Sequence, residues 1–300
     1  MVQQAAAPPA MVDATESPST LAAGTKGEKP SPMGLLKPVY LSVFVDTMGI
    51  ALTIPVLPYY ALAFGINGFE LGLLMASYSA AQIVGSLVMG WVSDKYGRRP
   101  VIMLSFVGSA LGFFLAGISS SYPFLLVARV VGGLSGGSMP VAQAFIADIV
   151  EPAERSKYIG LTGATVGIAF TIGPGIGALL TIDAIGASAE LIFFLAAGFS
   201  CFSLVYAAAV MVEPQKQARA NDSAGTGSGL TAAQFALLLA RFATNYGFTV
   251  MQSTYALLLM ARWNYSSSTL GFVLLASGFV IAFVQGTRTS RCVGACARAQ

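Results

Sequence analysis

The sequence predicts an all-α protein that crosses a membrane many times, and three observations carry this prediction. Of its 300 residues, 55% are hydrophobic and only 10% are charged, whereas about 25% of the residues of a soluble domain are charged. Apolar segments recur along the chain, each of about 20 residues, the length that a helix needs to cross a bilayer. Lys and Arg gather in alternate connecting segments, as expected when consecutive helices reverse direction.

Eight apolar segments follow a polar N-terminal region. Residues 1–36 are rich in Ala, Pro, Ser, Thr and Gly, so they cannot bury enough apolar surface to order themselves. We expect them to form a disordered cytoplasmic tail. The predicted spans lie near residues 39–63, 70–92, 101–119, 123–148, 159–182, 189–212, 233–261 and 268–286.

A polar break divides the spans into two groups. Residues 213–231 combine charged residues with Gly and Ser, a composition typical of a flexible linker. We therefore expect a six-helix bundle over 37–212, a cytoplasmic linker over 213–231 and two further helices over 232–286. Residues 287–300 are polar and are expected to form an irregular tail.

The distribution of positive charge predicts the orientation of the chain. All but three of the 16 Lys and Arg residues lie in segments that share one side of the membrane. The exceptions are Arg262 on the opposite side, and Arg129 and Arg241 within spans. Because short loops rich in Lys and Arg stay cytoplasmic, we expect an integral, multi-pass protein with a cytoplasmic N-terminus. Whether its membrane is the plasma membrane or that of an organelle is left open.

Composition disfavours an enzyme. The chain has no histidine, which removes the commonest metal ligand and general base. Cys201, Cys292 and Cys296 form no CxxC pair, and no GxxxxGK[ST] loop occurs. We therefore expect no catalytic residue, no metal and no cofactor. A net charge of only +3 gives no basic field for nucleic acid, so we expect no nucleic-acid partner. The apolar spans make the lipid bilayer the expected surroundings of the chain.

The stretch GWVSDKYGRRP, residues 90–100, concentrates charge between two apolar runs. It satisfies the pattern G-x-x-x-D-[RK]-x-G-[RK]-[RK] at Gly90, Asp94, Lys95, Gly97, Arg98 and Arg99. Anchoring of a short inner loop by its positive charge is one explanation. The full pattern, however, resembles the loop 2–3 signature of the major facilitator superfamily of secondary transporters.

In that family the signature implies a gate, in which the acid meets the positive end of a helix of the other bundle and a nearby arginine. By the same resemblance Asp148, at the inner end of the fourth span, is expected to join Asp94 and an arginine. The alternative for Asp148 is a solvated acid at the membrane surface.

Further motifs follow in the family's order. MGIALTIPVLP, residues 48–58, resembles the first-helix motif of drug:proton antiporters, and the stretch 160–178 resembles their fifth-helix motif, with Ala169 and Ala178 in place of glycine. The prolines either shape the transport path or simply kink the helix for packing. Over roughly 38–212 the chain is similar to tetracycline:proton antiporters. The matching motif residues are Gly49, Pro55, Pro58, Gly160, Gly173, Pro174 and Gly177.

Charged side chains inside spans are costly and so are functional candidates. Asp46 is expected to contribute to proton or substrate coupling; the alternative is a hydrated acid near the inner surface. Arg129, in LLVARVVGG, matches the family's fourth-helix arginine, which the resemblance implicates in proton coupling. At 1.5 Å per residue, the two side chains differ in depth by about 10 Å, and whether they pair is left open. The cavity-lining candidates of the seventh predicted span are Arg241, Asn245, Tyr246 and Gln252.

The resemblance implies a secondary active transporter of a small organic solute or drug, working by proton-coupled antiport through alternating access. Its small partners are then the solute and protons. The family fold has two six-helix bundles, whereas this sequence provides one bundle and two helices of a second. We therefore expect a truncated product or an incomplete gene model. The alternative function is a non-transporting membrane protein that associates with a full-length transporter; the cargo and the direction of transport stay open.

Overall fold

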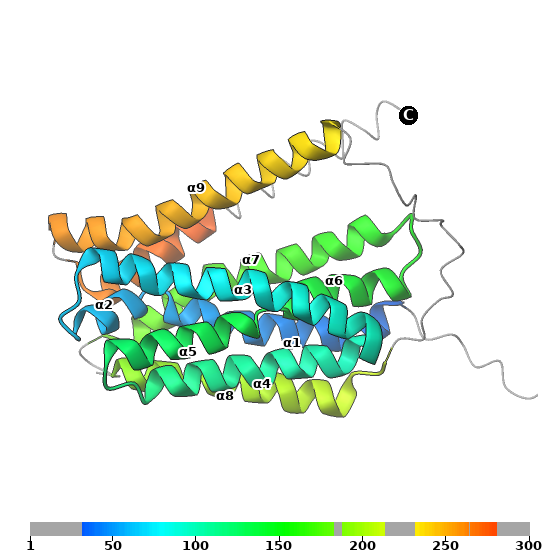
Figure 1. Ribbon diagram of the computed structural model, residues 1–300, viewed down its shortest axis with the longest axis horizontal. Coiled ribbons are helices and arrows are strands. Elements are labelled where there is room, and N and C mark those ends of the chain that lie inside the picture. The colour runs from blue at the N-terminus through cyan, green and yellow to red at the C-terminus, as the bar shows by residue number, and fades with distance from the viewer. Residues whose placement is uncertain (1–31, 183–187, 214–231, 264, 281–300) are drawn as a thin grey trace, which may run out of the picture. The chain divides into compact units, whose positions relative to one another are not determined.

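The computed structural model describes residues 32–182, 188–213, 232–263 and 265–280, and within these ranges every regular element is a helix (Figure 1). The predicted linker beyond Glu213 and the predicted tail 287–300 lie outside the described residues. The helices are α1 (Pro32–Thr53), α2 (Leu57–Leu62), α3 (Gly68–Tyr96), α4 (Arg98–Gly117), α5 (Tyr122–Leu134), α6 (Ser138–Ile149), α7 (Arg155–Leu180), α8 (Ala189–Val210), α9 (Ala232–Trp263) and an unlabelled helix, Ser267–Val280.

Six helical segments of the described chain are long and apolar enough to cross a membrane, judged by length and composition. They coincide with the first six predicted spans and make the chain a multi-pass membrane protein. The segments are Met33–Thr53, Gly68–Tyr96, Arg98–Gly117, Tyr122–Ile149, Arg155–Leu180 and Ala189–Val210.

Two of the predicted spans contain a break in the helix, which hydropathy did not predict. The first predicted span, 39–63, is divided by a turn over 54–56 between α1 and α2. Pro55 lies in that turn and supplies no N–H, and Pro58 lies in the first turn of α2, where a proline is tolerated. The fourth predicted span, 123–148, is divided at 135–137 between α5 and α6. Gly136 and Gly137 have low helix propensity, which favours the break.

The predicted tail extends too far into the chain. Helix α1 begins at Pro32, and Leu36 is fully buried, so the prediction of disorder is wrong for residues 32–36. The sequence window that contains these residues is polar on average, but Leu35 and Leu36 supply enough apolar surface to extend the helix by more than a turn. Proline at a helix start costs little because the first N–H groups have no intrahelical acceptor.

The seventh and eighth predicted spans are not among the six. Helix α9 has 32 residues, but the polar residues of its first half, among them Arg241 and Asn245, lower its mean hydropathy below that of the spans. The described part of the eighth segment, Ser267–Val280, is shorter than a span. Residues 281–286 lie outside the described residues.

The spanning helices bury polar groups and expose apolar ones. Helix α4 lies along α8, α1 packs between α7 and α8, and α3 packs on α5 (Figure 1). Their shared interior holds Ser42, Asp46, Ser200 and Ser203. Trp91, on the outer surface of α3, is 65% exposed. Several Leu, Ile and Val side chains are exposed as well. This arrangement suits a bundle surrounded by lipid, because lipid solvates apolar side chains and leaves polar ones to pair inside.

Candidate functional site

The first group of polar residues is the Arg98 cluster, which we define as Asp94, Arg98, Asp148 and Glu213. Its members come from the end of α3, the start of α4, the end of α6 and the segment directly after α8. All four positions therefore lie at the same end of the bundle. The motif residue Arg98 is at the centre and is only 8% exposed.

The Arg98 guanidinium joins the acids of two helices. Its Nη1 forms a 2.8 Å ion pair with Oδ1 of Asp94, and its Nε donates a 2.9 Å hydrogen bond to Oδ2 of Asp148. Nη1 also donates to Oγ of Ser93 at 2.6 Å. The structure thus brings Asp94, Arg98 and Asp148 together, and Asp148 is not a solitary solvated acid. Their role as a gate stays a prediction.

Glu213 caps helix α4, a contact that the sequence analysis missed. Its Oε1 and Oε2 accept the backbone N–H groups of Arg98 and Arg99, at 2.7 and 2.9 Å. The first N–H groups of a helix have no intrahelical acceptor, and the helix dipole favours negative charge there. From the sequence alone, Glu213 is the first residue of the predicted linker. Its one available signal was its place directly after the sixth apolar run, on the same side as the charged loop.

Gly97 allows this cap to form. Its φ is +104°, a backbone conformation that favours glycine, and a Cβ there would lie 2.5 Å from Oε1 of Glu213. Gly90 differs, because a Cβ at that position would meet no described atom within 4 Å. The exposed Lys95 places its Nζ over the rings of Trp91 and Tyr96, 5.5 and 5.2 Å from their centroids. Arg99 donates through Nη2 to the carbonyl oxygen of Ala208 at 2.6 Å.

The second group is the central site, which we define as Asp46, Tyr78, Ser109, Arg129 and Ser200. Asp46 lies in the middle of α1 and is 2% exposed, so it is not the hydrated surface acid that the sequence left as an alternative. Oγ of Ser200, on α8, donates a 2.8 Å hydrogen bond to its Oδ1. The hydroxyl of Ser109, on α4, also interacts with this carboxyl group.

Arg129 does not pair with Asp46. Its Cζ lies 4.2 Å from the ring centroid of Tyr78, on α3, which is a cation–π contact. Its Nε is buried and has no hydrogen-bond partner in the described part of the chain. Within those residues the Asp46 carboxylate forms no ion pair, and each charged group has a neutral partner instead. No motif marked Tyr78.

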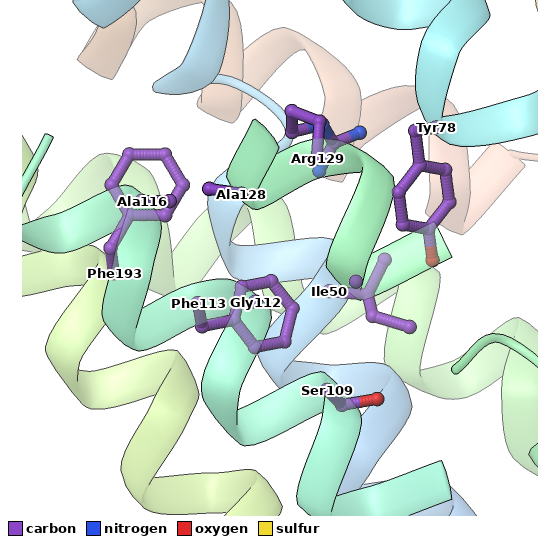
Figure 2. A pocket seen from close by; sticks show the side chains of 10 residues that line it. Ile50, Tyr78, Ser109, Gly112, Phe113, Ala116, Ala128, Arg129 and Phe193 are labelled. Atoms are coloured by element: carbon purple, nitrogen blue, oxygen red, sulfur yellow. The ribbon is translucent and has the colours of Figure 1, made fainter. Parts of the chain in front are cut away.

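Tyr78, Ser109 and Arg129 line one small cavity, and the Arg129 side chain extends toward the ring of Tyr78 (Figure 2). The cavity has a volume of about 10 Å³, close to the space that one water molecule needs. Its other walls are apolar and include Ile50, Phe113 and Phe193. The residues that line the cavity therefore include one cation and two hydroxyl groups but no acid.

The antiporter-motif glycines pack α1 against its neighbours and so position Asp46. A Cβ at Gly177 of α7 would lie 2.6 Å from the carbonyl oxygen of Leu52, and one at Gly49 would lie 3.1 Å from that of Ala196 on α8. Gly173 approaches Ala51 in the same way, and Pro174 lies inside α7. Gly160 is different, because a Cβ there would meet no described atom within 4 Å.

The candidates in the seventh predicted span are only partly described. Tyr246 of α9 is 63% exposed and stacks on Phe242, with 6.1 Å between the ring centroids. The side chains of Arg241, Asn245 and Gln252 lie outside the described residues. A cavity-lining role for these four residues stays a prediction. Among the described residues, no group of three or more His, Cys, Asp or Glu side chains is arranged to hold a metal ion.

Comparison with protein families and curated proteins yields one family. A model described as the Major Facilitator Superfamily matches residues 39–295. The chain is 25% identical over 252 residues to the quinolone resistance protein NorA of Staphylococcus aureus, covering 82% of this chain and 64% of that relative. It is 27% identical over 249 residues to multidrug resistance protein 1 of Bacillus subtilis, covering 81% and 63%. The chain thus spans slightly less than two thirds of the length of these relatives.

Solved structures share the fold. The human organic anion transporter MFSD10 (TETRAN) superposes with a TM-score of 0.66 at 22% identity, covering 86% of this chain and 72% of that one. A bacterial homologue of the human lysosomal transporter Spinster, inward-facing and unoccupied, gives a TM-score of 0.62 at 19% identity, covering 89% and 64%. At these identities the likeness shows the architecture alone.

Proposed function

Because the chain belongs to the Major Facilitator Superfamily, we propose that it acts as a secondary transporter that moves a small organic solute or drug in exchange for protons. The observation that carries the proposal is Asp46, a buried acid in the middle of the first span that has no basic partner among the described residues. Such a carboxyl group can take up and release a proton without first breaking an ion pair.

The relatives support the class of solute. Two of them are named for resistance to quinolones and to multiple drugs, and their cargo would be a small organic molecule. The chain matches only part of their length, so its own transport activity is part of the proposal. The family works by alternating access, in which one bundle rocks against the other.

The Arg98 cluster supplies the gate of the proposed cycle. Its ion pairs join α3, α4 and α6 at one end of the bundle, and Glu213 ties the segment after α8 to the same point. We place this end on the cytoplasmic side, with the N-terminus, because the positive charge of the chain gathers there.

The proposal is tested by flux through vesicles. The full 300-residue chain is reconstituted into liposomes with a pH-sensitive dye inside, and a fluorescent quinolone serves as the transported probe. An imposed pH gradient should drive movement of the probe together with an opposite movement of protons. Asp46→Asn should abolish the proton movement, whereas Glu190→Gln, the same change at an exposed acid of α8, should leave it intact.

The alternatives give distinct results. Probe flux that ignores the gradient would replace antiport by facilitated diffusion. No flux from the folded chain, with or without a gradient, would contradict transport by this chain and favour the non-transporting alternative. Proton movement that survives in Asp46→Asn would remove Asp46 from the mechanism.

A further inference from the structure

Tyr78 interacts with both opposite charges of the central site. Its ring carries the Arg129 guanidinium on one face, with 4.2 Å between Cζ and the ring centroid. Its hydroxyl group interacts electrostatically with Asp46 as well as with Arg129. The three residues come from α1, α3 and α5, and α3, which carries Tyr78, packs against α5, which carries Arg129.

The charged and titratable groups on the surrounding helices have other partners. Glu190 of α8 interacts with Tyr60, and Tyr158 of α7 interacts with Tyr40. Arg98 of α4 is bound to Asp148 of α6. Among the described residues, the direct hydrogen-bond partners of Asp46 are the neutral Ser200 and Ser109, and Tyr78 and Arg129 are the other titratable groups of the central site.

Ser109 links the Asp46 carboxyl group to the small cavity. Ser109 contacts the Asp46 carboxyl group and also lines the small cavity that Arg129 and Tyr78 border (Figure 2). The buried Nε of Arg129 has no hydrogen-bond partner in the part of the chain that the structure describes. A buried guanidinium normally forms a strong, charge-assisted pair where a carboxylate is within its reach. Here the aromatic ring holds it instead.

We propose that Tyr78 is a positioning residue whose ring keeps Arg129 and Asp46 apart, so that Asp46 stays able to exchange a proton. The proposal rests on the proposed function and adds a residue to it. A closed pair between Arg129 and Asp46 would hold the acid as a carboxylate, because an opposite charge within about 4–6 Å favours the charged form. The cation–π contact stabilises the guanidinium over the ring, which offsets part of what the ion pair would contribute.

The test follows the protonation of Asp46 directly and needs no transport. Infrared difference spectra of the full chain in lipid are recorded across pH, and the C=O band of the protonated acid is assigned by its loss in Asp46→Asn. In Tyr78→Leu, Arg129 is free to close the pair, so the band should disappear at a pH about 1–3 units lower than in the native chain. Tyr78→Phe keeps the ring and should leave the midpoint unchanged.

A second pair of variants separates positioning from general damage. In an Arg129→Gln background there is no guanidinium to release, so Tyr78→Leu should no longer shift the midpoint. A shift that persists in this background, an equal shift in Tyr78→Phe, or no shift in Tyr78→Leu would each overturn the proposal. Should Tyr78→Leu fail to fold, Tyr78→Met provides the same ring deletion.

The outcome is separable from that of the proposed function. If the Asp46 band titrates and moves as expected but vesicles show no proton-driven flux, the positioning role stands and the transport proposal falls. If flux is coupled to protons but the Tyr78 variants do not move the band, the transport proposal stands and the positioning role falls.

Discussion

The Arg98 cluster and the central site contain the same kinds of groups but differ in how these groups are paired. In the Arg98 cluster, Arg98 meets two carboxylates at 2.8 and 2.9 Å, and Glu213 accepts two N–H groups of a helix start. In the central site, Asp46 meets a serine hydroxyl and Arg129 meets an aromatic ring. The acid and the arginine of the central site thus each have a neutral partner and form no ion pair with each other.

The difference suggests that the Arg98 cluster stabilises the helix arrangement, whereas the central site allows an acid to change its charge. A fully paired network stabilises one arrangement of helices, because removal of any member leaves a charge unpaired. An acid that is held only by neutral groups can change its charge at a lower energetic cost. The two regions should therefore respond oppositely to mutation: the Arg98 cluster should lose stability, and the central site should lose coupling.

The largest effect is expected at Arg98. Arg98→Leu leaves the exposed carboxylate of Asp94 and the partly buried carboxylate of Asp148 without their guanidinium. The cost should exceed the roughly 1 kcal/mol of an exposed pair and approach the cost of about 3–5 kcal/mol for a buried one. The free energy of unfolding in detergent measures the loss. Lys95→Ala, which removes an exposed charge from the same motif, is the control and should change stability little. Equal stabilities of the two variants would show that the cluster does not hold the bundle together.

A close approach between helices should give the next largest effect. In Gly177→Ala the new Cβ meets the carbonyl oxygen of Leu52 at 2.6 Å, and forcing α7 away from α1 costs about 1–3 kcal/mol. Gly160→Ala makes the same substitution in the same helix, where a Cβ meets no described atom within 4 Å. The difference between their thermal unfolding midpoints is the readout. An unchanged midpoint in Gly177→Ala would show that α1 adjusts without cost.

A smaller loss is expected at the helix cap. Glu213→Gln keeps an acceptor oxygen for only one of the N–H groups of Arg98 and Arg99 and removes the negative charge at the start of α4, a change of about 1 kcal/mol. Because the group is exposed, high salt should shrink the difference. Unfolding measured at low and high ionic strength checks both points. A loss that does not depend on salt would indicate that shape rather than charge matters at this cap.

The smallest change in stability is expected at the acid of the central site. Asp46→Asn keeps a carbonyl oxygen as acceptor for the Ser200 hydroxyl, so the free energy of unfolding should change by less than about 1 kcal/mol. Its proton coupling should nevertheless be lost. A loss of stability as large as that of Arg98→Leu would erase the distinction between the two regions.

Much of the architecture was predictable from local sequence. Six of the eight predicted spans coincide with helices that are long and apolar enough to cross a membrane, because the free energy of placing a segment in lipid is a sum over neighbouring residues. The major facilitator resemblance is confirmed by the family match over residues 39–295. The interruptions at 54–56 and 135–137 were missed because hydropathy averages over the few residues that break a helix.

The candidate sites were predictable only as separate residues. Asp46, Arg129 and Arg98 stand out because charge is costly in or near a span. Their partners do not, since Tyr78, Ser109 and Ser200 are ordinary residues by composition. The cap by Glu213 joins residues 115 positions apart in the chain, a separation that no local pattern describes.

By itself, the sequence determined the class of protein, the spans of its first bundle and the charged residues that lie in or near those spans. These depend on composition and on short-range order, which a chain carries before it folds. Only the tertiary structure decided that Arg98 pairs with two acids, whereas Asp46 pairs with a serine and Arg129 with the ring of Tyr78. Pairing depends on which helix faces meet, and that is set by the packing of α1, α3, α4, α5 and α8 around one another.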